Sequence, residues 1–218
     1  MLQSMTTRFS LIIIYGILSV NANDQPIKLS RFPSSLPTAM PVKACKVLMQ
    51  KQQFGEAINS CSEAIQTNPK EINLYLIRGY SYAQTRQFPE AIQDADKAIK
   101  LNAKNAHGYF LRCATKRLQK KFRDALPDCN QAITIDPKFS DYYTERGIVR
   151  SGLADFEGAM GDIQTAIGQT PDDETAYFWR GYIKIKLNLD RKDACEDIRK
   201  SGQLGFKAAE KAINAYCK

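Results

Sequence analysis

Histidine is nearly absent from this 218-residue chain, which contains only His107. A metal cage built from several imidazoles therefore cannot form. The sequence also has no glycine-rich phosphate loop, no nucleophile elbow and no Cys-x-x-Cys pair. Because the usual signatures of enzymes are missing, we expect a protein without catalytic activity, without a bound metal and without a cofactor.

The chain also lacks an apolar run long enough to span a bilayer comfortably, since the longest covers only residues 9–20. Arg8 precedes this run, and Val20 and Ala22 place small residues at the minus-three and minus-one positions of a cleavage site. This pattern predicts a signal peptide over residues 1–22, with an uncleaved anchor as the alternative. The mature protein is then expected to be periplasmic or secreted, with no membrane span after cleavage.

Residues 23–37 contain three prolines, three serines and no helical periodicity, which predicts an extended linker. The formal net charge of the chain is +8, and such a balance favours acidic partners. The lysines and arginines are spread along the chain rather than clustered in a stripe, so we do not expect a nucleic-acid partner.

A short phrase recurs every 34 residues and dominates the rest of the sequence. Its four copies are Tyr75-Leu76-Ile77-Arg78-Gly79, Tyr109-Phe110-Leu111-Arg112-Cys113, Tyr143-Thr144-Glu145-Arg146-Gly147 and Tyr177-Phe178-Trp179-Arg180-Gly181. Pairs of alanine and an apolar residue recur in step with it, among them Ala57-Ile58, Ala91-Ile92, Ala98-Ile99, Ala132-Ile133 and Ala166-Ile167. A fixed period of this length indicates an array of equivalent structural units.

Each unit contains two stretches of helical periodicity separated by a turn, which predicts an all-α fold of helical hairpins. The five predicted repeats cover residues 38–71, 72–105, 106–139, 140–173 and 174–205, followed by a capping helix within 206–218. The second helices of the first three repeats are expected at 54–67, 88–101 and 122–135. In the fifth repeat Ala194 comes one residue late, so its turn should contain an insertion.

The pattern resembles the tetratricopeptide repeat family, whose units are 34-residue helical hairpins. The residues that match the family's packing positions are an aromatic residue (Tyr75, Tyr109, Tyr143, Tyr177), a small residue (Cys45, Gly79, Cys113, Gly147, Gly181) and a turn aromatic (Phe54, Phe88, Phe122, Phe156). Pro41 and Ala103 depart from the pattern. The resemblance implies a right-handed α-solenoid that binds a peptide or protein in a concave groove.

Comparison of the repeats with one another predicts four structural ion pairs. Four repeats have an arginine before the small residue and an aspartate sixteen or seventeen residues later: Arg78 and Asp94, Arg112 and Asp128, Arg146 and Asp162, Arg180 and Asp197. The first repeat has Ala44 and Ser60 at these positions and so lacks both partners. Facing positions of a hairpin suit bidentate contacts, although arginines that reach into the groove are the alternative.

The six cysteines also follow the repeat. Cys45 and Cys61 occupy the same two positions in the first repeat that Cys113 and Cys129 occupy in the third. In an oxidising compartment these matched positions predict two disulfides, and Cys195 with Cys217 is expected to tie down the capping helix. Buried free thiols are the alternative.

The resemblance also implies which residues line the groove, and these are aromatic, aliphatic or basic. They are Lys46, Leu76, Tyr80, Phe110, Arg117, Ile148, Phe178, Tyr182 and Lys186. Packing between the helices is the alternative role for the aromatic members. We therefore expect a protein–protein interaction scaffold that is not an enzyme. The alternative is a structural subunit of an envelope assembly that associates with itself. The sequence defines neither the oligomeric state nor the partner, so both functions stay open.

Overall fold

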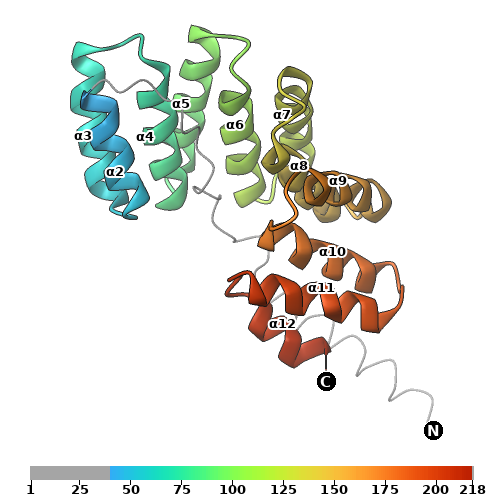
Figure 1. Ribbon diagram of the computed structural model, residues 1–218. Helices are drawn as coiled ribbons and strands as arrows, with labels where there is room; N and C mark the ends of the chain where they lie inside the picture. The colour runs from blue at the N-terminus through green and yellow to red at the C-terminus, as the bar shows by residue number, and fades with distance from the viewer. Residues whose placement is uncertain (1–39, 218) are drawn as a thin grey trace, which may run out of the picture. The chain divides into compact units, whose positions relative to one another are not determined.

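The computed structural model describes residues 40–217, and within this range it contains eleven α-helices and no β-strand (Figure 1). The predicted all-α fold is confirmed. The helices are α2 (Met40–Gln50), α3 (Phe54–Thr67), α4 (Ile72–Gln84), α5 (Phe88–Leu101), α6 (Ala106–Leu118), α7 (Phe122–Ile135), α8 (Ser140–Gly152), α9 (Phe156–Gln169), α10 (Glu174–Lys186), α11 (Arg191–Gln203) and α12 (Ala209–Tyr216). The predicted signal peptide and linker lie outside the described residues.

The helices form successive hairpins (Figure 1), and neighbouring helices pack on one another from α2 to α7 and from α9 to α12, as in helical-repeat proteins. The chain divides into two compact units, 26–145 and 146–218, with the boundary inside α8. In the first unit α4 packs on α2, α3, α5 and α6. In the second unit α10 packs on α9 and α11, and α11 packs on α12. Helices α3, α5 and α7 begin and end at the predicted residues.

Small residues allow the two helices of a hairpin to approach closely. A Cβ atom added to Gly79 would lie 2.8 Å from a methyl group of Leu111 and 2.9 Å from the Cβ of Asp94. A Cβ atom on Gly181 would lie 2.6 Å from the carbonyl oxygen of Ala194. A Cβ atom at either of these two glycines would force the neighbouring atoms to shift, so close packing of the helices favours glycine there.

Each hairpin turn contains one residue in the left-handed region of backbone conformation, and in no turn is it glycine. These residues are Gln52, Arg86, Lys120, Ala154 and Asn188, with φ between 53° and 62°. The next N–H closes the helix by donating to a carbonyl oxygen five residues back, for example from Gln87 to Tyr82 at 2.8 Å. The fifth turn contains the expected extra residue, because four residues separate Lys186 from Arg191.

The capping helix is shorter than predicted. Gly205 adopts a φ of +101° after α11, and the N–H of Phe206 donates to the carbonyl oxygen of Ser201 at 3.0 Å. These features end α11 and turn the chain, so α12 begins at Ala209 rather than Phe206. No helix within residues 40–217 is long and apolar enough to cross a membrane.

Candidate partner-binding face

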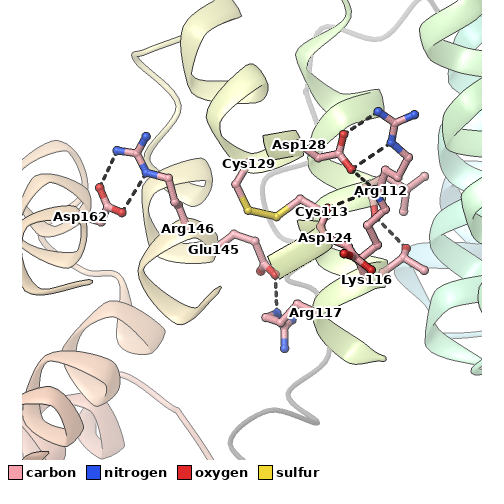
Figure 2. Close-up of a disulfide and its surroundings, with 12 residues drawn as sticks. Arg112, Cys113, Lys116, Arg117, Asp124, Asp128, Cys129, Glu145, Arg146 and Asp162 are labelled. Carbon is pink, nitrogen blue, oxygen red and sulfur yellow. Dashed lines mark hydrogen bonds and ion pairs between the residues drawn. A yellow bond between two sulfur atoms is a disulfide. The ribbon is translucent and has the colours of Figure 1, made fainter. Parts of the chain in front are cut away.

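The four predicted arginine–aspartate pairs are present, and each is bidentate. In the second repeat Nε of Arg78 donates to Asp94 Oδ2 at 2.8 Å and Nη2 donates to Oδ1 at 2.7 Å. Arg112 and Asp128, Arg146 and Asp162, and Arg180 and Asp197 repeat this geometry (Figure 2 shows the first two of these three). These arginines therefore bind within the scaffold. The alternative, that they reach into a groove, is wrong for the Nε and Nη2 atoms, because both bind the aspartate of the same repeat.

A second cation, which was not predicted from the sequence, binds the same aspartate in three repeats. Lys116 contacts Asp128 at 2.7 Å, Arg150 contacts Asp162 at 2.8 Å and Lys184 contacts Asp197 at 2.8 Å. Each of these cations lies four residues after the paired arginine, one helical turn away on the same face. Their spacing of 34 residues was the signal that could have revealed them.

Two of the three predicted disulfides are formed, Cys113–Cys129 in the third repeat and Cys195–Cys217 between α11 and α12. The predicted bridge between Cys45 and Cys61 is not formed, and both side chains are buried free thiols. The Cys45 sulfur is instead hydrogen-bonded to Ser60 Oγ at 3.6 Å. Ser60 stands where other repeats have the paired aspartate, so this local replacement gives the thiol a different partner.

Most residues predicted to line an open groove are buried, which corrects that prediction. Leu76, Tyr80, Phe110, Arg117, Ile148 and Phe178 are each at most 8% exposed. Lys46, Tyr182 and Lys186 are half-buried. The physical reason is that large side chains on the first helices of the repeats fill the space between these helices. The ring of Phe110 packs on Tyr142 at 5.1 Å, and the ring of Phe178 packs on Phe206 at 4.8 Å.

The first helices of the unit 26–145 nevertheless share one polar cluster, which we call the central cluster and define as Tyr80, Arg117, Asp141 and Glu145. The Arg117 Nε donates to Glu145 Oε1 in a buried ion pair (Figure 2). Only 1% of the Arg117 side chain and 7% of the Glu145 side chain are exposed. Burial, and next the charges of Asp141 and Glu145, hold the pKa of Tyr80 well above its usual value, so its phenol stays protonated.

An aromatic group lies beside the central cluster. His107 Nδ1 is hydrogen-bonded to the hydroxyl of Tyr142, and the rings of His107 and Phe139 are 5.2 Å apart. Burial lowers the pKa of His107 to about 4, while Asp136 acts weakly in the opposite direction. The imidazole is therefore neutral near pH 7, which agrees with a packing role and not with a cationic site.

In the unit 146–218 the half-buried candidates lie together on α10. The ammonium group of Lys186 lies 5.4 Å from the centre of the Tyr182 ring, which packs edge-on against Trp179. A separate open cavity of about 710 Å³, which the sequence analysis did not foresee, lies between the end of α11 and α12. Its lining includes Phe206 and Ile213 together with Arg199 and Lys207.

Within the part of the chain that the structure describes, no group of three or more His, Cys, Asp or Glu side chains is placed to hold a metal ion.

The fold and this face define a class of protein, the all-α repeat proteins built from antiparallel helical hairpins. A sequence match to the tetratricopeptide repeat covers residues 72–105, the second repeat of the array. Comparison with curated proteins gives no match. The match identifies residues 72–105 as a tetratricopeptide repeat, and the structural neighbours described next share the fold of the array.

Solved structures of tetratricopeptide repeat proteins share the fold at low sequence identity. A thermophilic TPR protein of Thermus thermophilus is 12% identical with a TM-score of 0.70, covering 80% of this chain and 95% of that one. MamA of Desulfovibrio magneticus RS-1 is 18% identical with a TM-score of 0.61, covering 77% and 97%. YrrB, described as a TPR protein with an unusual peptide-binding site, is 15% identical with a TM-score of 0.57, covering 80% and 90%.

Proposed function

We propose that this protein is a non-catalytic scaffold that holds a peptide segment of a partner protein against the first helices of its repeats, around the central cluster. Tetratricopeptide repeat proteins bind protein or peptide partners, and YrrB is described as having a peptide-binding site. In this proposal the partner contacts the accessible edges of the first helices, and the central cluster, whose Arg117 and Glu145 side chains are buried, holds those helices in place. Lys46 on α2 and Tyr182 and Lys186 on α10 contribute partly accessible contacts in their own units.

The observation that supports this proposal is the Arg117–Glu145 pair, because it breaks the repeat. The position of Arg117 holds Ala83, Ser151 and Ile185 in the second, fourth and fifth repeats. The position of Glu145 holds Ile77, Leu111 and Trp179 in the second, third and fifth repeats. The repeat fold therefore does not need a charged residue at the position of Arg117 or of Glu145. Burying a charged side chain costs free energy, and an apolar side chain avoids this cost. A role in recognition explains why the pair is present.

The test is selection of peptides from a random displayed library on the mature protein and on a double variant, Arg117→Met with Glu145→Leu. Apolar replacement of a buried ion pair is often neutral or stabilising, so the variant is expected to fold. We expect the wild-type protein to enrich a peptide motif that the variant binds at least tenfold more weakly.

The matched control is Lys70→Ala, which removes an exposed cation in the turn between α3 and α4 and should leave peptide binding unchanged. Circular dichroism melting verifies that each variant is folded. Enrichment of the same peptides by the wild-type protein and the double variant would show that the central cluster does not bind them.

We also propose that the protein acts outside the cytoplasm, as periplasmic or secreted. The signal-peptide pattern in residues 1–22 supports this location, and so do the two disulfides, because such bonds persist in oxidising compartments. Intact-mass analysis of the protein purified from its native host tests it. We expect a chain that starts at Asn23, whereas a mass that includes Met1 would contradict cleavage.

A further inference from the structure

The first and third repeats place cysteines at the same two positions but in different oxidation states. In the third repeat Cys113 and Cys129 are joined, with Cα atoms 5.4 Å apart, a separation typical of disulfides. In the first repeat Cys45 on α2 and Cys61 on α3 are thiols, and both are fully buried. The equivalent backbone framework can therefore accept a disulfide, and the first repeat contains its reduced counterpart.

The two thiols of the first repeat are unequal. A hydrogen bond from Cys61 is the largest effect on Cys45 and lowers its pKa to about 7, with Ser60 acting in the same direction against burial. The same hydrogen bond, with burial, raises the pKa of Cys61 strongly, while Arg78 lowers it and Asp94 raises it slightly. Near neutral pH Cys45 is therefore partly thiolate and Cys61 holds its proton. Thiol–disulfide exchange begins with attack by a thiolate, and Cys45 is the member of the pair that can supply one.

The first repeat also has fewer stabilising bonds of its own than the third repeat. It lacks the arginine–aspartate pair, since Ala44 and Ser60 replace both partners. Among the described helices, α2 packs chiefly on α3 and α4, whereas the inner helix α6 packs on α4, α5 and α7. A helix that packs on fewer neighbours opens locally at a lower cost, so we expect a reagent to reach these buried sulfurs.

We propose that Cys45 and Cys61 form a reversible dithiol–disulfide pair, a modification site at which a small-molecule or protein disulfide acts as the oxidant. The Cys45 thiolate attacks one sulfur of the oxidant, forms a mixed disulfide and releases one thiol of the oxidant. Cys61 then loses its proton to solvent, attacks the Cys45 sulfur and releases the second thiol. Two electrons pass to the oxidant, and the new bond joins α2 to α3 where the ion pair is missing.

The test uses the full mature protein with all six cysteines, equilibrated in glutathione buffers from fully reduced to fully oxidised. Thiols are trapped by acid, alkylated and mapped by mass spectrometry. We expect Cys45–Cys61 to interconvert reversibly across the series while Cys113–Cys129 and Cys195–Cys217 stay oxidised. The proposal is overturned if the three pairs change together, or if Cys45 and Cys61 stay entirely thiol or entirely disulfide throughout.

Two single variants test the order of attack. Cys61→Ser should stop the reaction at a glutathione adduct on Cys45, and Cys45→Ser should give at least tenfold less adduct on Cys61. Equal adducts on both variants would contradict the assigned roles. The alkylation rate of Cys45 in the reduced protein should rise with pH around a midpoint near 7, and Ser60→Ala should move that midpoint upward. A pair of merely packed, buried thiols would show a midpoint above the usual cysteine value.

Discussion

At the scale of single residues, the charge of each repeated arginine is stabilised by the aspartate that faces it. The hydrogen bonds to Asp94, Asp128 and Asp197 raise the pKa values of Arg78, Arg112 and Arg180, so the guanidinium groups stay charged. Arg112 also contacts Asp96 of the preceding repeat at 2.5 Å, and Arg78 contacts Ser62 in the same way at 3.0 Å. The arginine therefore links neighbouring repeats as well as the two helices of its own hairpin.

We predict that Asp94→Ser destabilises the protein by about 3 kcal/mol, because Arg78 would lose its bidentate partner while remaining largely buried. The double variant Arg78→Ala with Asp94→Ser imitates the natural first repeat, Ala44 and Ser60, and should recover part of that loss. Urea unfolding of both variants measures the difference. Equal stability of the single and double variants would contradict this prediction, because it would show that an unpaired Arg78 charge does not destabilise the protein.

The second residue-scale prediction concerns acid. The pKa of His107 is about 4 in the folded protein, lower than that of a free imidazole at about 6.5, because burial disfavours its charged form. As the pH falls from 6.5 to 4, the unfolded chain binds a proton at His107 that the folded protein does not bind. The contribution of the neutral imidazole to the free energy of unfolding is therefore fully present above pH 6.5 and is lost between pH 6.5 and 4. Because His107 is half-buried, about 3 kcal/mol is an upper bound for the loss.

The variant His107→Gln removes this titration and should flatten that part of the pH dependence. Unfolding free energies from urea titrations at pH 7, 5.5 and 4.5 check it. Parallel pH curves for the wild-type protein and the variant would contradict a buried neutral imidazole.

At the scale of helices and turns, the repeat determines backbone geometry even where the sequence varies. Each of the five hairpin turns has one residue in the left-handed backbone conformation, although the side chain of this residue differs from turn to turn. Asparagine tolerates this conformation, whereas alanine pays roughly 1 kcal/mol for it. The turn geometry is thus imposed by the helices on either side, which must meet at a fixed angle, and only partly by local preference.

We therefore predict that Ala154→Gly stabilises the protein by up to about 1 kcal/mol, because glycine adopts a positive φ without strain. Asn188→Gly is the matched control and should change stability by only a few tenths of a kcal/mol. Thermal melting of both variants gives the comparison. A destabilised Ala154→Gly variant would show that chain entropy outweighs the relief of strain.

At the scale of the whole molecule, stability is shared unequally along the array. The third repeat has a disulfide, an arginine–aspartate pair and a second cation on the same aspartate. The first repeat has none of these within its described residues. In a linear array each repeat is stabilised mainly by itself and its neighbours, so such differences persist locally.

The corresponding prediction is a gradient in native-state hydrogen exchange. Amides of α2 should exchange fastest among the repeat helices, and amides of α6 and α7 should exchange slowest. Mass spectrometry of peptides from the exchanged protein measures the order. Uniform protection from α2 to α7 would indicate that this unit opens only as a whole.

The sequence by itself determined the repeat length, the boundaries of α3, α5 and α7 and the four arginine–aspartate pairs, because these features recur with a fixed period and repetition supplies an internal comparison. It also predicted the bonds Cys113–Cys129 and Cys195–Cys217. Only the tertiary structure decided that Cys45 and Cys61 are thiols and that Tyr80, Phe110 and Phe178 are buried. Burial depends on how adjacent first helices fill the space between them, and a pattern within one helix does not contain that information. The Arg117–Glu145 pair was likewise hidden, since its partners come from different repeats and occur once.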